Sequence, residues 1–218
     1  MEISSKKASF ASTARRLRSL SREPASRSPR FIIIATENTY IEKQYFEDIL
    51  DIPSHVKVEI LSTEDNNSAP QHVISRLHNF IEIYKEDGSS FGISDEFWLM
   101  LDVDRWHKLS EVAEEALQFG YQLAVSKPCF ELWLLCHYQA PPSDISSCRS
   151  VEDLLGKSLG VKYKKQLKPS DFPYFRKNIG LAVRHAIESD IYPDHILPQN
   201  TGTRVYRVVQ SILGLNRK

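Results

Sequence analysis

The sequence predicts an α/β fold in which a mostly parallel sheet is flanked by helices and followed by an α-helical C-terminal extension. Three observations support this prediction. Strand-like and helix-like segments alternate between residues 30 and 140, the strand at 96–104 is almost continuously apolar, and Pro-rich, basic stretches begin after residue 140. Strands separated by helices pair in parallel and are buried on both faces, which makes them apolar throughout.

The first half of the alternating region contains two strand–helix units. Residues 30–36, "RFIIIAT", form a short apolar strand, and residues 40–51 follow as a helix with its apolar residues on one face. "HVKVEILS" at 55–62 begins with the alternation of a half-buried strand. The second helix has apolar residues at a spacing of 3.6: Val73, Leu77, Phe80, Ile81 and Tyr84.

The second half repeats this alternation. After "EFWLMLDVD" at 96–104, a helix at about 108–119 ends at Gly120. The strand "YQLAVS" and a helix within "CFELWLLCHY" complete the region, and further helices are expected near 174–189 and 203–214. The predicted organisation is a flexible basic arm at 1–29, an α/β domain at 30–140 and a helical extension at 141–218.

The net charge of zero hides an uneven distribution along the chain. Residues 1–30 contain eight Lys and Arg residues and two acidic residues, a net charge of +6, together with eight serines. This composition is typical of a flexible arm. Such an arm is either attracted to nucleic-acid phosphates or simply solvated, and the sequence leaves both interpretations open.

Targeting signals and cysteine pairs are not evident in the sequence. No apolar run approaches the roughly 20 residues of a membrane span, and residues 1–20 lack the apolar core of a secretory signal. We therefore expect a cytoplasmic protein with no membrane partner. Cys129, Cys136 and Cys148 are odd in number and form no CxxC pair, so we expect reduced structural thiols.

Acidic residues follow two of the predicted strands. Glu37 comes directly after the first strand, and Asp102 and Asp104 end the third. In a parallel sheet these residues reach the same edge, where ligands bind. The alpha carbons of Asp102 and Asp104 are about 7 Å apart on an extended chain and on one side of it. Carboxylates that close repel each other unless a cation lies between them, and Mg²⁺, or Mn²⁺ in its place, is the simplest candidate.

A structural alternative exists for each acid. Thr39 and Glu42 fit a capping box at the start of the first helix, which explains Glu42 but leaves Glu37 without a structural task. Aspartates at strand ends are also common turn residues. Three enzyme classes place a DxD pair after an apolar strand: haloacid-dehalogenase-type phosphatases, nucleotide-sugar transferases and Toprim domains. Only the last combines it with a glutamate after the first strand, as here.

The chain resembles the RloB-like family, a Toprim-fold family of bacterial defence loci. The family's Glu-Gly-Glu-x-Thr-Glu-x-x-Tyr-Phe pattern is matched from Glu37 to Tyr45-Phe46, and its Asp-x-Asp by Asp102 and Asp104. "SKPCFELWLLCHY", from Ser126, matches a Ser-x-Pro-x-Phe-Glu-Leu-Trp-Leu-Leu-x-His signature, and "QNTGTRVYRVV" is similar to its C-terminal Asn-Pro-Ser-Thr segment. The family's Gly, second Glu and Thr are replaced here by Asn38, Thr39 and Ile41, and the third position of a fuller DxDxD pattern is Trp106.

The resemblance implies a magnesium-dependent nuclease that acts in anti-phage defence with a partner ATPase of the AAA or ABC type. It implies that Glu37 serves as general base or acid. The substrate, DNA or RNA including tRNA, stays open, as does a homo-oligomeric state. Two other functions also stay open: a degenerate Toprim subunit that only binds the ATPase, and a nucleotide-sugar transferase that uses the DxD pair.

Further site residues are expected after the fourth strand and in two basic segments. Glu131 either stabilises the first turn of its helix or binds a second metal, with Ser126 beside it and Lys127 near the scissile phosphate. His107 and His137 are more typical of packed or surface imidazoles than of ligands. Residues 161–177 combine basic and aromatic side chains that could follow a nucleic-acid strand or anchor the next helix. The basic candidates there and in the last helix are Lys164, Lys165, Lys168, Arg176, Lys177, Arg204 and Arg207.

Overall fold

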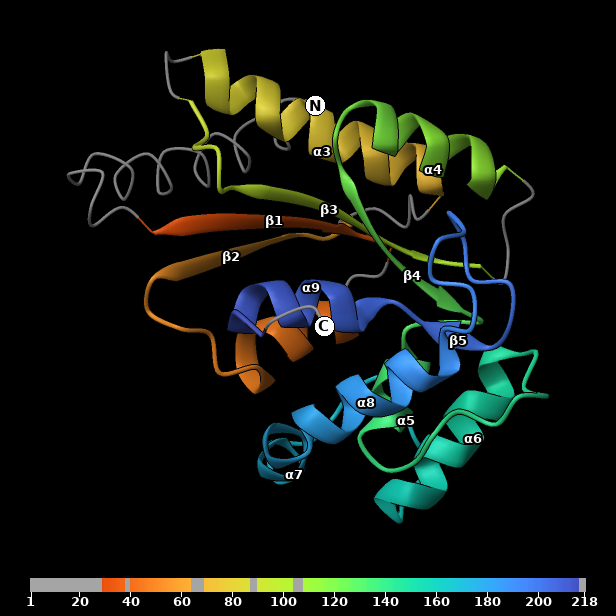
Figure 1. The fold of residues 1–218 in the computed structure, drawn as a ribbon. Helices are drawn as coiled ribbons and strands as arrows, with labels where there is room; N and C mark the ends of the chain where they lie inside the picture. The colour runs from red at the N-terminus through yellow and green to blue at the C-terminus, as the bar shows by residue number, and fades with distance from the viewer. Residues whose placement is uncertain (1–28, 38–39, 64–68, 87–89, 104–107, 216–218) are drawn as a thin grey trace, which may run out of the picture.

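The computed structural model describes residues 29–37, 40–63, 69–86, 90–103 and 108–215, and its centre is a five-stranded sheet (Figure 1). The strand order is β2-β1-β3-β4-β5, with the first four strands parallel and β5 antiparallel to β4. This topology confirms the predicted α/β fold. The strand bounds are β1 (Arg30–Thr36), β2 (Val56–Leu61), β3 (Glu96–Asp102), β4 (Gln122–Lys127) and β5 (Gly202–Thr203).

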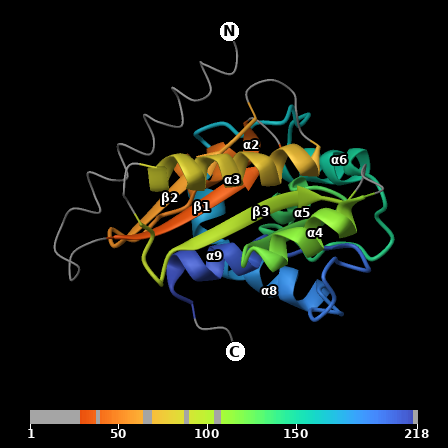
Figure 2. The ribbon, with the colours of Figure 1, turned by 90° about the horizontal axis from the view of Figure 1, so that it is seen from above.

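Helices cover both faces of the sheet. On one face, α3 (Pro70–Glu86) and α4 (Leu109–Gln118) cross over the strands, as Figure 2 shows from above. The other face is covered by α9 (Val205–Leu213), with the remaining helices around and beyond it (Figure 1). These are α2 (Ile41–Gln44), its continuation as the π-helix η1 (Tyr45–Ile49), α5 (Glu131–Cys136), α6 (Cys148–Leu159), α7 (Phe172–Lys177) and α8 (Ile179–Ser189).

Alternation along the strands divides the core into two layers. In β1, Ile32 and Ile34 pack on the side of α5, α8 and α9, whereas Phe31 and Ile33 pack on the side of α3 and α4. In β3 the same alternation puts Trp98 and Met100 in the first of these layers. Both layers are lined by fully buried aliphatic and aromatic side chains, which explains why the strands are apolar throughout.

The helix α6 and the strand β5 were not predicted. The start of α6 has a recognisable signal, because the Ser147 hydroxyl accepts a hydrogen bond from the Ser150 N–H, and its end has another in Gly160 at φ 68°. β5 has only two residues and no periodicity to detect.

Residues 141–218 also share a core with the sheet, because Val205 and Val209 pack in the same layer as Ile32. The predicted boundary near residue 140 therefore does not separate two cores.

No helix in the described ranges is both long and apolar enough to cross a membrane. The longest of them, α3, has one buried apolar face, and its opposite face contains charged and polar side chains.

His137, from the family-like signature, is fully buried between aromatic rings. Its Nδ1–H donates to the Trp133 carbonyl (3.0 Å), and its Nε2 accepts from the Tyr45 hydroxyl (3.2 Å). A carbonyl can only accept a hydrogen bond, which fixes this tautomer. Burial lowers the pKa of His137 to about 4 from its usual 6.5. The histidine is therefore a neutral core residue, which confirms the packed interpretation.

This buried histidine should weaken the fold in mild acid. Between pH 6.5 and 4 the unfolded chain binds a proton at His137 that the folded chain does not, so stability falls as the pH is lowered through this range. We expect about 2 kcal/mol of this loss between pH 7 and pH 5. In urea titrations, His137→Gln should show a smaller loss between these two pH values than the parent, whereas His72→Gln, at an exposed position, should lose as much as the parent. Equal losses in all three proteins would contradict the assignment.

Candidate functional site

Two of the predicted acids meet at the carboxyl edge of the sheet. Glu37 follows β1 directly, and Asp102 is the last residue of β3. The Asp102 backbone N–H donates a hydrogen bond to Oε1 of Glu37 at 3.0 Å. Both side chains are buried, with exposed fractions of 6% and 8%. The parallel pairing of β1 with β3 thus brings together residues that are 65 positions apart in the chain.

Two further carboxylates lie near Asp102. Alternation places Asp102 on the same face as Trp98 and Met100, the face that α2 and α5 cover at this edge. Glu131 is the first residue of α5 and Glu42 belongs to α2, and both are buried. Burial raises the pKa of Asp102 well above its usual range, and the negative charges of Glu37, Glu42 and Glu131 raise it further. We call these four residues the acidic cluster.

Glu42 is the member of the acidic cluster that the sequence predicts to be part of a helix cap. The structure starts α2 at Ile41 with Tyr40 as N-cap residue, so Glu42 is not at the third helical position of the predicted capping box, and Thr39 lies outside the described residues. Instead the Glu42 side chain is 1% exposed. The helical spacing indicates this burial, because Glu42 precedes the buried Tyr45 and Phe46 by three and four residues and therefore lies on the same face of the helix.

Uncharged hydrogen-bonding groups lie beside the acidic cluster. The Tyr163 hydroxyl donates to Oε1 of Glu131 over 3.5 Å, and burial together with the charges of Glu131 and Glu42 raises the pKa of Tyr163. A hydrogen bond with Cys148, then burial, then the charge of Glu131 raise the pKa of the Cys129 thiol. The phenol and this thiol therefore stay protonated at neutral pH, and neither adds negative charge. Cys129, Cys136 and Cys148 all lie in the described part of the chain, where no disulfide bond joins them.

A divalent cation would relieve the repulsion within the acidic cluster, and its donors suit magnesium. All four side chains supply carboxylate oxygens, the ligands that Mg²⁺ prefers, and Mg²⁺ needs only one or two of them because it keeps several waters. The other predicted ligand, Asp104, lies outside the described residues. Within the described ranges, no three His, Cys, Asp or Glu side chains are already arranged around a common metal position. The donor chemistry thus fits Mg²⁺, without a preformed three-ligand cage among these residues.

Comparison with known protein families assigns the chain. The model of the family described as RloB-like protein matches residues 32–212, from the first strand to the last helix. The chain belongs to the RloB-like protein family. This confirms the resemblance inferred from the glutamate after the first strand and the Phe-Glu-Leu-Trp signature. The comparisons with curated proteins and with solved structures returned no match.

Ser126 and Lys127 begin the RloB-like signature, and the structure does not place either side chain at the acidic cluster. Ser126 is level with Asp102 in the sheet, but its hydroxyl is buried and bonded to the Thr203 hydroxyl at 2.8 Å, so it joins β4 to β5 instead of contacting substrate. Lys127, one residue on, is on the opposite face by alternation. Its Nζ donates to the Gln199 carbonyl at 2.6 Å, beside a hollow that contains none of the acidic cluster.

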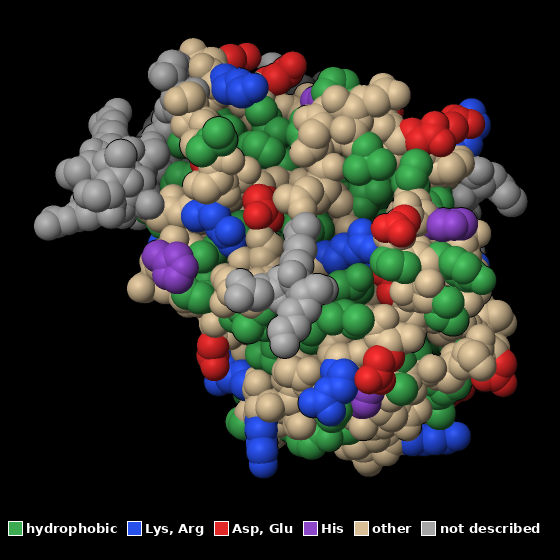
Figure 3. Space-filling view, viewed as in Figure 1, with side chains coloured by type: hydrophobic (Ala, Val, Ile, Leu, Met, Phe, Trp, Pro, Cys, Tyr) green, Lys and Arg blue, Asp and Glu red, His purple; other side chains and the backbone are tan. Residues whose placement is uncertain are grey.

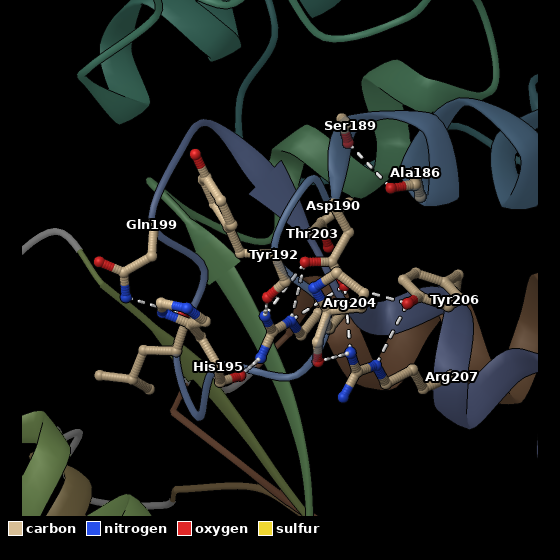
Figure 4. Close-up of polar contacts among 12 residues, drawn as sticks. Ala186, Ser189, Asp190, Tyr192, His195, Gln199, Thr203, Arg204, Tyr206 and Arg207 are labelled. Atoms are coloured by element: carbon tan, nitrogen blue, oxygen red, sulfur yellow. Dashed lines mark hydrogen bonds and ion pairs between the residues drawn. The ribbon is translucent and has the colours of Figure 1, made fainter.

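Arg204 and Arg207 are not the exposed substrate-binding pair that the sequence predicted. The Arg204 side chain is 1% exposed and its Nε lies 3.1 Å from both carboxylate oxygens of Asp190 (Figure 4). Its other nitrogens donate to backbone carbonyls of the preceding loop, including that of Tyr192 at 2.7 Å. Arg207 also donates to Asp190 at 3.1 Å, and to the Pro193 carbonyl. Both arginines stabilise the loop that leads into β5.

The basic segment 161–177 is divided between structural and exposed residues. Arg176 donates to the carbonyls of Asp48 and Ile49 at the end of η1, and Lys165 forms an ion pair with Glu152 at 3.2 Å. The aromatics Tyr163 and Phe175 are buried, as the anchoring interpretation predicts. The other candidates, Lys164, Lys168 and Lys177, are exposed. Figure 3 shows the basic side chains of this face dispersed among acidic and apolar ones, with no single basic patch.

Proposed function

We propose that this RloB-like protein is a magnesium-dependent nuclease that cleaves phosphodiester bonds of nucleic acid. The observation that supports the proposal most strongly is the acidic cluster, in which buried carboxylates from three different elements surround Asp102 at the carboxyl edge of a parallel sheet. Four acids in one buried place are costly for folding. Such a cost is expected where a site must attract a divalent cation, which in turn would bind a phosphate.

Each element of the site has a distinct task in this proposal. Bound Mg²⁺ would supply an activated water and offset the charge on the phosphate oxygens. Asp102 would be its main ligand together with Asp104, which lies outside the described residues. Glu131 or Glu42 would bind a second ion. Glu37 is held by the Asp102 N–H with its carboxylate at the strand edge, where it can exchange a proton with the attacking water or the leaving oxygen.

The direct test is a cleavage assay on several nucleic acids. The full chain is incubated with duplex DNA, single-stranded DNA, total RNA and tRNA, with Mg²⁺, Mn²⁺ or EDTA, and with and without the partner ATPase that the family resemblance implies. We expect cutting of at least one substrate that requires the metal ion and is lost in Glu37→Gln. Cutting that survives both EDTA and Glu37→Gln would disprove the proposal.

A second candidate function is that of a binding subunit without catalysis. It is favoured because no three side chains within the described ranges are arranged as ligands of one metal ion. In this alternative the acidic cluster is a remnant, and the protein serves as a binding subunit for the partner ATPase. The two functions separate in cells that express both proteins. A nuclease loses its toxicity with Glu37→Gln, whereas a binding subunit keeps full biological activity with the same change.

The family resemblance extends the proposal to the cellular setting. We propose that the nuclease acts in anti-phage defence and is kept inactive by the partner ATPase until infection. A nucleotide-sugar transferase is less compatible with the site, because such an enzyme uses its DxD pair without a glutamate from the first strand. It would bind nucleotide sugars equally well after Glu37→Gln.

A further inference from the structure

A groove next to the acidic cluster has the properties of a binding channel for a nucleic-acid strand. It has a volume of about 780 Å³ and runs between α6 and the segment 160–165 that returns along it. Helix α6 packs against α5, whose first residue is Glu131 (Figure 1). The inference below rests on the proposed function and specifies where its substrate binds.

Two residues connect the groove with the acidic cluster. Tyr163 lines the groove, and its hydroxyl donates to Glu131. Cys148 also lines the groove, and its side chain is hydrogen-bonded to that of Cys129, two residues before Glu131. The groove is therefore separated from Glu131 by the Tyr163 side chain, and no member of the acidic cluster lines the groove itself.

Close packing fixes the shape of the groove. Gly156 is buried in the middle of α6, and a Cβ added there would lie 2.9 Å from the Val161 carbonyl oxygen and 3.2 Å from the Tyr163 nitrogen. Only glycine allows the returning segment to approach the helix this closely. The contact holds Tyr163 against Glu131 and keeps the two walls of the groove at a fixed distance.

Positive charge in the groove exceeds negative charge. Four cations and the two acids Glu152 and Asp153 line it, a net charge of +2. One of the cations, Lys165, pairs with Glu152. The other three are exposed and form no ion pair with any residue in the part of the chain that the structure describes: Arg149, Lys157 and Lys162.

Two of these charges are spaced along helix α6 rather than gathered at one point. Arg149 and Lys157 are eight residues apart on α6, about 12 Å along the helix axis, which suits a ligand with several phosphates in a row. A positively charged groove that follows the backbone is typical of proteins that bind single strands. We propose that the groove binds one single strand of nucleic acid, whose phosphates contact Arg149, Lys157 and Lys162 on the side of Tyr163 that faces away from Glu131.

The test measures binding of fluorescent 20-nucleotide single strands, DNA and RNA separately, to the full chain carrying Asp102→Asn, over a range of salt concentrations. Each phosphate contact contributes about 0.7 to the slope of log affinity against log salt for single strands. Replacing Arg149, Lys157 and Lys162 by Gln should therefore lower this slope by about 2. The matched control replaces the exposed Lys57, Lys85 and Arg184, which lie outside the groove, and should leave the slope unchanged.

Any of the following results would overturn the inference. The first is an unchanged slope in the groove variant. The second is an equal decrease in the control, or a decrease only when Lys164, Lys168 and Lys177 are replaced instead. The third is a duplex that binds as tightly as a single strand. Binding is measured here with a chain that cannot cut, so this test and the cleavage test fail independently of each other.

Discussion

Asp102→Asn should abolish metal-dependent cleavage and, without metal, make the folded chain more stable. The loss of activity follows from the proposed role as metal ligand. A metal ion supplies several kcal/mol of transition-state stabilisation, and each 1.4 kcal/mol corresponds to a factor of ten in rate, so we expect a decrease on the order of 10³-fold. A single-turnover cleavage assay at saturating Mg²⁺ measures it.

The gain in stability follows from the electrostatics of the acidic cluster. Burial and the charges of Glu37, Glu42 and Glu131 raise the pKa of Asp102, so its ionised form destabilises the fold at neutral pH. A neutral amide of the same shape removes this repulsion. In EDTA the variant should unfold at a higher urea concentration than the parent, and Mg²⁺ should stabilise the parent more than the variant.

Asp95→Asn provides the control with the opposite result. The Asp95 carboxylate precedes β3 at the other end of the strand and accepts hydrogen bonds from the N–H groups of Phe31 (2.8 Å) and Gly92 (2.7 Å). An amide can accept only one of the two, so the fold should lose about 1 kcal/mol while cleavage is unchanged. If Asp102→Asn behaved like Asp95→Asn, Asp102 would be structural and the site assignment wrong.

Arg204→Met should cause the largest loss of stability among single substitutions outside the hydrophobic layers. It leaves Asp190 as a buried carboxylate with fewer donors and frees the carbonyls that the guanidinium group holds (Figure 4). Breaking a buried ion pair from one side costs about 3–5 kcal/mol. Urea denaturation measures the loss, and the exposed Arg184→Met on α8 should change stability by less than about 0.5 kcal/mol.

A double substitution separates the ion pair from the packing of the arginine. If the pair accounts for the loss, Arg204→Met combined with Asp190→Asn should cost less than the sum of the two single changes. A stable Arg204→Met protein that binds nucleic acid poorly would instead support the surface role that the sequence predicted for this residue. The side chain's exposed fraction of 1% makes that outcome the less expected one.

Periodicity explains why most of the fold was predictable. The strands from β1 to β4 are apolar runs because both of their faces are covered, and helices such as α3 show the 3.6-residue spacing of one buried face. α6 was missed although it has a serine N-cap and a final glycine, because its surroundings are rich in proline and charge. The two residues of β5 owe their pairing to the turn that Arg204 holds, which no local pattern indicates.

The acidic site was predictable only in part. Glu37 and Asp102 could be expected together because strands separated by helices are parallel, and parallel strands end at one edge. Glu42 was assigned to a cap, since a capping box and a buried acid on a helix face look alike when the start of the helix is uncertain by one residue. Tertiary packing alone decides which interpretation holds.

The sequence by itself thus determined the order of the strands β1 to β4 and of the helices between them, the family, and three of the four acids, Glu37, Asp102 and Glu131, because these depend on local spacing and on residue types. Only the tertiary structure decided how charges far apart in sequence are used. Arg204 is neutralised by Asp190 in the interior, whereas Arg149, Lys157 and Lys162 line a groove next to the carboxylates. The local sequence around a basic residue does not show whether the residue is buried in an ion pair or exposed in a groove. Its burial and its partners depend on contacts that form only when the chain folds.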